Sequence, residues 1–196
     1  MPLSAEHLEP IRVGWREEFG ELDVAMYVAI AAIPTPRLDR SFRELSRAAD
    51  HSKLWAGIAV ALASTGGRRG RCAAVNGVAS IVATSALVNL VLKPLSDRRR
   101  PDRRTLAVPA ARRVAMPGST SFPSGHAASA FAFATGVAIA LPQAGIPLTA
   151  TAALVAYSRV HTGVHYPSDA IAGSVIGAGL APTVVAAIEH RRSMAK

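Results

Sequence analysis

Ionisable and hydroxyl-bearing side chains gather in three short stretches, each at the edge of an apolar run. These stretches are residues 93–101, 121–126 and 158–169. The first carries Lys93 and Arg100 and the third carries Arg159, without an equal set of carboxylates beside them. Because guanidinium groups match phosphate oxygens in shape and charge, these three cations predict a site for a multiply charged anion.

The same stretches hold groups that transfer protons and attack electrophiles. Ser124 and Gly125 open a predicted helix, whose free N–H groups and positive dipole end also favour an anion. His126 and His165 change protonation near neutral pH. Asp169 follows His165 by four residues, so on a helix it would hydrogen-bond that imidazole and orient it. Together they predict a nucleophile, an orienting carboxylate, an acid and an anion cage.

The composition indicates what kind of scaffold positions these groups. Half of the 196 residues are hydrophobic, 18% are charged, and mean hydropathy is +0.26. Such a clustered apolar surplus excludes disorder, a collagen-like fibre and a disulfide scaffold, and the lone Cys72 does not indicate a redox compartment. The net charge of +9 beside long apolar runs favours anionic lipid over nucleic acid as a partner.

Four long uncharged stretches are predicted to lie in a membrane. They are Leu54–Gly67, Cys72–Leu92, Ala127–Ser158 and Ala170–Ile188. The third spans 32 residues and is interrupted at 142–147, so it predicts two helices and a total of five spans. We therefore expect an all-α integral-membrane bundle, because a soluble core of this size could not enclose five such helices. In an up-and-down bundle the three polar stretches converge on one membrane face.

The N-terminal quarter differs from this core. Residues 1–21 lack the pattern of a signal peptide. The 12-residue run Leu22–Ile33, apolar except for Asp23, is too short to span a bilayer and predicts an interfacial or re-entrant piece. Arg37–His51 has an amphipathic pattern typical of either a membrane-surface helix or one packed on the protein. The expected organisation is an N-terminal segment, a transmembrane core and a basic tail, at residues 1–53, 54–188 and 189–196.

The three polar stretches together resemble a known signature. Lys-x6-Arg-Pro, Pro-Ser-Gly-His and Ser-Arg-x5-His-x3-Asp are the motifs of the type 2 phosphatidic acid phosphatase superfamily, whose members are metal-independent phosphatases. The matching positions are Lys93, Arg100, Pro101, Pro123, Ser124, Gly125, His126, Ser158, Arg159, His165 and Asp169. The similarity covers about residues 54–188. Integral-membrane members usually have six spans, whereas five and an interfacial segment are expected here.

The resemblance implies a role for each matching residue. His165 would attack phosphorus to form a phosphohistidine, and Asp169 would hold it in the right tautomer. His126 would protonate the leaving alkoxide and later activate water. The phosphoryl oxygens would be bound by Lys93, Arg100, Ser124, Gly125 and Arg159. No metal or other cofactor is implied, and the expected partners are the bilayer and a membrane lipid phosphate.

Other interpretations are weaker. A metal site at His161, His165 and Asp169 lacks further ligands nearby, and His161 is better interpreted as bonding locally. A proton-coupled transporter would not need three cations at the same site, and an inactive lipid-binding relative would not need the whole signature. The remaining arginines of 98–113 are predicted to form a solvated, headgroup-facing surface. Trp55 is predicted to be an interface anchor.

Charge distribution predicts an orientation. Residues 1–53 and 93–125, on the side of the predicted site, carry 15 Lys and Arg, against 6 in residues 68–71 and 189–196. Without Lys93 and Arg100 the comparison is 13 against 6. The positive-inside rule therefore places the site on the cytoplasmic face of the cell membrane.

That orientation narrows the substrate. It disfavours a polyprenyl diphosphate released on the outer face, and leaves phosphatidylglycerophosphate and a polyprenyl-phosphoryl-5-phosphoribose, a precursor of cell-wall arabinan. The short chain resembles small actinobacterial members of the superfamily, which implies the phosphoribosyl lipid. The oligomeric state is not predicted.

Overall fold

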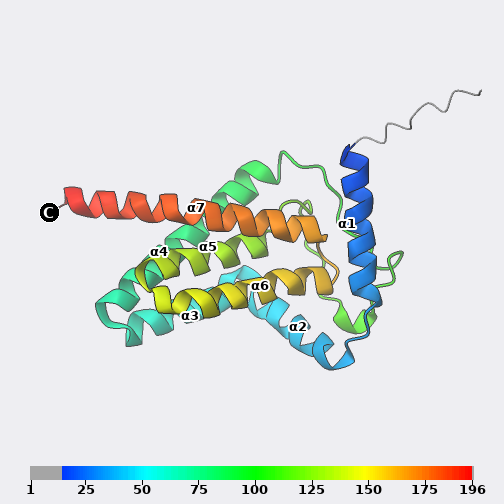
Figure 1. The fold of residues 1–196 in the computed structure, drawn as a ribbon, viewed down its shortest axis with the longest axis horizontal. Helices are drawn as coiled ribbons and strands as arrows, with labels where there is room; N and C mark the ends of the chain where they lie inside the picture. The colour runs from blue at the N-terminus through cyan, green and yellow to red at the C-terminus, as the bar shows by residue number, and fades with distance from the viewer. Residues whose placement is uncertain (1–14, 196) are drawn as a thin grey trace, which may run out of the picture.

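The computed structural model describes residues 15–195, and in that range the chain forms helices and no strand (Figure 1). This confirms the all-α class. Residues 1–14, with which the predicted N-terminal segment begins, and Lys196 of the basic tail lie outside the described residues.

The bundle consists of five helices that run side by side in Figure 1. They are α3 (Lys53–Thr65), α4 (Gly67–Ala86), α5 (Gly125–Ala140), α6 (Gly145–His161) and α7 (Pro167–Met194). A π-helical turn, Leu87–Leu92, continues α4. Each predicted stretch corresponds to a helix, and the 32-residue stretch divides at the expected turn. The prediction placed the start of α4 too late, because Arg68, Arg69 and Arg71 lie within its first turns.

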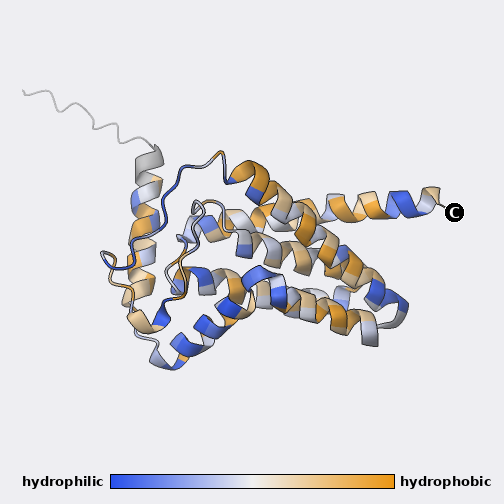
Figure 2. Ribbon diagram, turned by 180° about the vertical axis from the view of Figure 1, so that it is seen from behind, coloured by the Kyte–Doolittle hydropathy of each residue, from blue (hydrophilic) through white to orange (hydrophobic). Residues whose placement is uncertain are grey.

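Membrane character is supported by two helices of the described chain. Gly67–Leu92 and Pro167–Met194 are long and apolar enough to cross a bilayer, whereas α5 is apolar but has only 16 residues. The 13 residues of α3 reach about 20 Å, less than the roughly 30 Å of a hydrocarbon layer. Figure 2 shows hydrophobic residues along the bundle and hydrophilic ones at its ends. The expected number of five spans is not confirmed.

Helix α5 lies at the centre of the bundle, where small residues let neighbouring backbones approach. A Cβ added at Gly177 of α7 would lie 2.1 Å from the carbonyl oxygen of Ala128, and one at Gly173 would lie 2.4 Å from that of Ser124. Close packing of this kind is how Gly-rich helices associate in lipid. It brings the first turn of α7 directly against the first turn of α5, which carries part of the candidate site.

Trp55 belongs to the core rather than to a membrane interface. Only 1% of its surface is exposed, and its ring centroid lies 5.3 Å from that of Phe133 on α5. The prediction of an interface anchor is therefore wrong, because α3 directs this residue inward.

Helices α1 (Trp15–Ala32) and α2 (Pro36–Ala48) precede the bundle, and α1 stands across one of its ends (Figure 1). The face that α2 turns to the protein includes polar residues: Asp39 and Ser46 are buried, while Leu38 is 49% exposed. Asp39 pairs with His161 Nε2 at 3.1 Å. The local partner predicted for His161 is therefore wrong.

A long hydrophilic loop, residues 93–124, connects α4 to α5 (Figure 2). Arg112 anchors it: its guanidinium is 1% exposed, donates to Asp39 at 2.9 Å, and also donates to the carbonyls of Ile30, Ala31 and Ile33. The prediction that Arg112 faces solvent is wrong, because an arginine buried among acceptors fastens the loop to the α1–α2 junction.

Candidate active site

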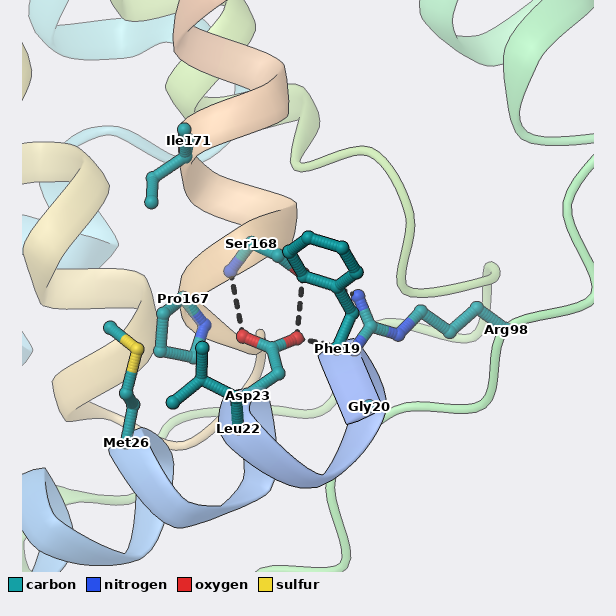
Figure 3. Close-up of a pocket in the computed structure, with 9 residues that line it drawn as sticks. All are labelled: Phe19, Gly20, Leu22, Asp23, Met26, Arg98, Pro167, Ser168 and Ile171. Atoms are coloured by element: carbon teal, nitrogen blue, oxygen red, sulfur yellow. Dashed lines mark hydrogen bonds and ion pairs between the residues drawn. The ribbon is translucent and has the colours of Figure 1, made fainter. Parts of the chain in front are cut away.

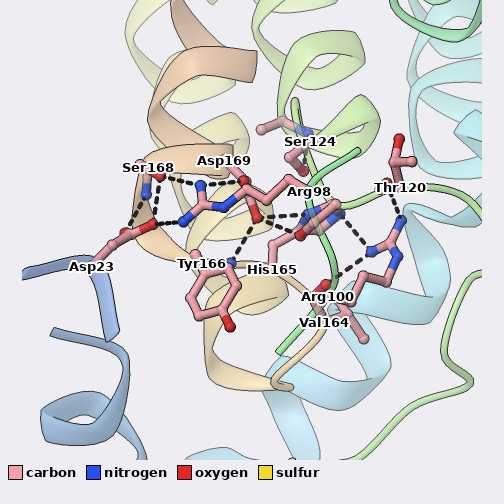
Figure 4. Close-up of polar contacts among 12 residues, drawn as sticks. Asp23, Arg98, Arg100, Thr120, Ser124, Val164, His165, Tyr166, Ser168 and Asp169 are labelled. Carbon is pink, nitrogen blue, oxygen red and sulfur yellow. Dashed lines mark hydrogen bonds and ion pairs between the residues drawn. The ribbon is translucent and has the colours of Figure 1, made fainter. Parts of the chain in front are cut away.

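The three polar stretches meet at one end of the bundle, as their positions at helix ends predicted. Hydrogen bonds or short contacts connect all eight predicted site residues, directly or through one intermediate residue. The bonds around His165 and Asp169 can be followed in Figure 4.

His165 and Asp169 form a buried pair. The imidazole Nδ1 lies 3.5 Å from Asp169 Oδ2, and the side chains are 2% and 0% exposed. His165 precedes α7 and Asp169 lies in its first turn, so the pair spans a helix N-terminus instead of one continuous helix. Asp169 also accepts from Ser121 Oγ at 2.5 Å and from the N–H of Tyr166 at 2.9 Å. These donors hold the carboxylate ionised and fixed behind the ring.

The other ring nitrogen of His165 faces the cation cage. Nε2 lies 3.2 Å from Arg100 Nη1, which also donates to the carbonyl of Val164 at 2.8 Å. A proton on Nδ1, facing Asp169, leaves the lone pair on Nε2. Burial, together with the positive charges of Arg100 and Arg159, lowers the pKa of His165 to about 4. Asp169 opposes this effect, because its negative charge and hydrogen bond raise the pKa. The ring is therefore neutral at neutral pH, as a nucleophile must be.

Lys93 and Arg100 converge on one hydroxyl. Lys93 Nζ donates to Ser119 Oγ at 3.1 Å, and Arg100 Nη2 reaches the same atom at 3.2 Å. Burial, followed by repulsion from Arg100 and Arg159, lowers the pKa of Lys93. Cations gathered this closely are stabilised by a bound anion.

The N-terminus of α5 faces the same cage. Ser124 caps the helix by accepting from Ala127 N at 3.5 Å, and its own N–H donates to the carbonyl of Asp169 at 3.0 Å. A Cβ at Gly125 would lie 3.7 Å from Lys93 Nζ, which shows how near this amine is to the helix start. Backbone N–H groups and an ammonium thus adjoin one another, as in an anion site.

Arg159 is almost fully buried at the end of α6. Its Nη1 donates to Ser46 Oγ at 2.5 Å and lies 3.5 Å from Asp50 Oδ1. Its Nε has no hydrogen-bond partner among the described residues. A buried guanidinium with an unused donor is suited to a further anionic ligand.

His126 has a carboxylate partner that the sequence did not reveal. Its Nε2 lies 2.8 Å from Asp50 Oδ1, and the two side chains are 24% and 39% exposed. Asp50 begins a short turn in which His51 and Ser52 adopt φ angles of +54° and +58°. Non-glycine residues rarely adopt this conformation, and where they do it commonly accompanies function. Asp50 lies outside the three polar stretches, so only the fold connects it with His126.

Arg98 also belongs to the site, contrary to the prediction of a solvated surface. It donates to Asp169 Oδ1 at 2.8 Å and to Ser168 Oγ at 2.6 Å, and it pairs with Asp23 of α1. Asp23 in turn accepts from Ser168 N at 2.9 Å (Figure 3). The sequence did contain one signal for this contact. Asp23 is a lone charge in an apolar run, and such a charge is energetically costly unless it is paired.

Comparisons with known proteins identified a family and several relatives. A family model described as the PAP2 superfamily matches residues 74–193. Decaprenylphosphoryl-5-phosphoribose phosphatase of Mycobacterium tuberculosis (strain H37Rv) is 35% identical over 161 residues, which cover 81% of this chain and 85% of that protein. The Mycolicibacterium smegmatis protein of the same name is 36% identical over 158 residues, 79% of this chain and 81% of its own.

A solved structure supports the fold. The transmembrane PAP2-type phosphatidylglycerolphosphate phosphatase from Bacillus subtilis superposes with a TM-score of 0.65. It is 24% identical and covers 89% of this chain and 87% of its own. At this identity the likeness concerns the helical architecture alone.

Proposed function

Because the chain belongs to the PAP2 superfamily, we propose that it is a membrane lipid phosphatase that hydrolyses a phosphomonoester through a phosphohistidine on His165. The observation that supports this most directly is the setting of His165. One ring nitrogen faces the fixed carboxylate of Asp169, and the other faces Arg100. That arrangement supplies an oriented, neutral nucleophile aimed at an anion cage.

In the proposed first step, His165 Nε2 attacks phosphorus and the bond to the leaving alkoxide breaks. His126 gives its proton to that oxygen, which departs as an alcohol. The phosphoryl oxygens are held by Lys93, Arg100 and Arg159 and by the N–H groups at the start of α5, which stabilise the charge in transfer.

In the second step, neutral His126 takes a proton from water, and the resulting hydroxide attacks the phosphohistidine. The P–N bond breaks, His165 is regenerated and inorganic phosphate leaves. Asp50 acts as a positioning residue here, because a carboxylate 2.8 Å from His126 Nε2 orients the ring and stabilises its protonated form.

For the substrate we propose a polyprenyl-phosphoryl-5-phosphoribose, cleaved at the 5-phosphate. Two relatives above 30% identity, each covered over more than two thirds of its length, carry decaprenylphosphoryl-5-phosphoribose in their names. Phosphatidylglycerophosphate and polyprenyl diphosphates are the alternatives. The excess of Lys and Arg in residues 1–53 and 93–125 supports a multi-pass protein of the cell membrane with a cytoplasmic site.

Phosphate release by purified protein in detergent tests the proposal. The three lipid phosphates are compared in the same micelles, with and without EDTA, and a ³²P-labelled substrate is used to trap an acid-labile, base-stable phosphoenzyme. We expect EDTA-insensitive turnover and a label on the wild type but not on His165→Ala. Absence of hydrolysis, or activity abolished by EDTA and restored by metal, would contradict the phosphohistidine scheme.

A further inference from the structure

A small pocket opens directly beside His126. It has a volume of about 200 Å³ and is shared by the turn after α2, the end of α4 and the start of α5. His126, Lys93 and Gly125 form its wall toward the phosphate cage, whereas His165 does not line it. The pocket is therefore continuous with the anion site on the side of the proposed acid.

The rest of the lining is largely polar, where a membrane helix would be apolar. It includes Ser85 and Asn89 on the α4 segment and Ser129 on α5. The Oγ atoms of Ser85 and Ser129 are 3.2 Å apart, and Asn89 Nδ2 donates to the carbonyl of Ser85 at 2.9 Å. Both serine hydroxyls and the carboxamide oxygen of Asn89 retain capacity for a ligand.

Asn89 is the most informative of these residues. It is exposed on the helix Gly67–Leu92, one of the two that could cross a bilayer, and its neighbour Leu90 is 75% exposed. It also lies in the π-helical turn Leu87–Leu92. Polar side chains in such helices are costly and usually functional, and π-turns are frequent at functional sites.

The chemistry of phosphoryl transfer assigns an occupant to this pocket. The attacking and leaving atoms lie roughly in line on opposite sides of phosphorus. With His165 as nucleophile and His126 as acid, the leaving alcohol must lie on the His126 side, where this pocket opens.

Resting on the proposed function, we infer that the pocket binds the leaving alcohol, and that Asn89, Ser85 and Ser129 hydrogen-bond its hydroxyl groups. The class of substrate this favours is a phosphate on the primary hydroxyl of a small polyhydroxylated ring, such as a pentose. Pockets for drug-sized ligands measure about 300–1,000 Å³, so a pocket of about 200 Å³ suits a single sugar ring.

Two matched amphiphiles test the inference in the same detergent micelles. One is dodecyl ribofuranoside 5-phosphate, and the other is 5-(dodecyloxy)pentyl phosphate, which has the same tail and reacting group but no hydroxyls. We expect the wild type to prefer the ribofuranoside tenfold or more in kcat/KM. Asn89→Leu should reduce this preference to threefold or less, with turnover of the pentyl ester within threefold of the wild type.

Ser129→Ala provides a second variant in case Asn89→Leu does not fold, and Ser64→Ala, an exposed position on α3 outside the pocket, is the matched control. Equal hydrolysis of the two amphiphiles by the wild type would overturn the inference and leave the phosphatase intact. The inference would also be overturned if Asn89→Leu or Ser129→Ala slowed the hydrolysis of both amphiphiles equally. Failure to hydrolyse either amphiphile would instead contradict the proposed function.

Discussion

The candidate site contains two histidine–carboxylate pairs that are built differently. His165 and Asp169 are both buried, with side chains 2% and 0% exposed, and the Asp169 carboxylate accepts hydrogen bonds from three further donors. His126 and Asp50 are closer, at 2.8 Å, yet they are 24% and 39% exposed, and Arg159 is the one other ion-pair partner of Asp50 among the described residues.

This difference matches the two tasks. A nucleophile benefits from a fixed, dry position, because a low dielectric keeps it neutral and strengthens the interactions that aim it. A residue that gives a proton to a departing alcohol and then takes one from water must be reached by both. The site therefore has a rigid half and an accessible half, and substitutions should affect them unequally.

The largest effect is expected from His165→Ala. Without the nucleophile no phosphoenzyme forms, so turnover should fall by about 10⁴-fold or more. The measurement is phosphate release, with Ser64→Ala as the control variant. Retention of more than 1% of wild-type kcat would show that another group attacks phosphorus.

Asp169→Asn should damage both activity and stability. The amide cannot hold the His165 tautomer as a carboxylate does, and comparable losses in other triads reach about 10⁴-fold, so we expect kcat to fall at least 100-fold. The change also leaves Arg98 and Ser121 facing a poorer acceptor. A clear decrease in Tm should therefore accompany the loss, and an unchanged Tm would contradict the network described above.

Asp50→Asn should produce a smaller loss confined to the accessible half. We expect kcat to fall about tenfold on an alkyl phosphate, because the imidazolium of His126 loses its carboxylate. The loss should nearly disappear with p-nitrophenyl phosphate, whose leaving group needs little protonation, and Asp50→Glu should restore part of it. Tm should change little at this half-exposed position. An equal loss with both leaving groups would show that Asp50 does not act through His126.

The last prediction concerns the dependence of stability on pH. The pKa of His165 is about 4 in the folded protein and about 6.5 in an unfolded chain. Between these two pH values the folded state therefore binds fewer protons than the unfolded state. Its contribution to stability is therefore present above pH 6.5 and is lost as the pH falls toward 4. The Tm of the wild type relative to that of His165→Ala should therefore decrease as the pH falls over that range, because the variant lacks this imidazole. A constant difference would indicate an ordinary pKa for His165.

Much of this protein was predictable from the sequence alone, because its signals are local. The all-helical class and the position of each bundle helix follow from runs of apolar residues bounded by turns, and the turn at 142–147 was visible as Pro and Gly. The convergence of the three polar stretches follows from the alternating direction of consecutive helices. His165 and Asp169 could be paired from the sequence because they lie only four residues apart.

Only the tertiary structure decided which distant residues complete the site. Asp50 lies 76 positions from His126, Asp23 lies 75 from Arg98, and Asp39 lies 73 from Arg112. No periodicity connects such pairs, and an isolated charge has the same appearance in a sequence whether it faces water or a buried partner. The prediction of Trp55 as an interface anchor failed because the apolar run that contains it does not specify which side of the helix packs against α5. Ion pairing and packing depend on distance in space, and that distance is set when the helices assemble.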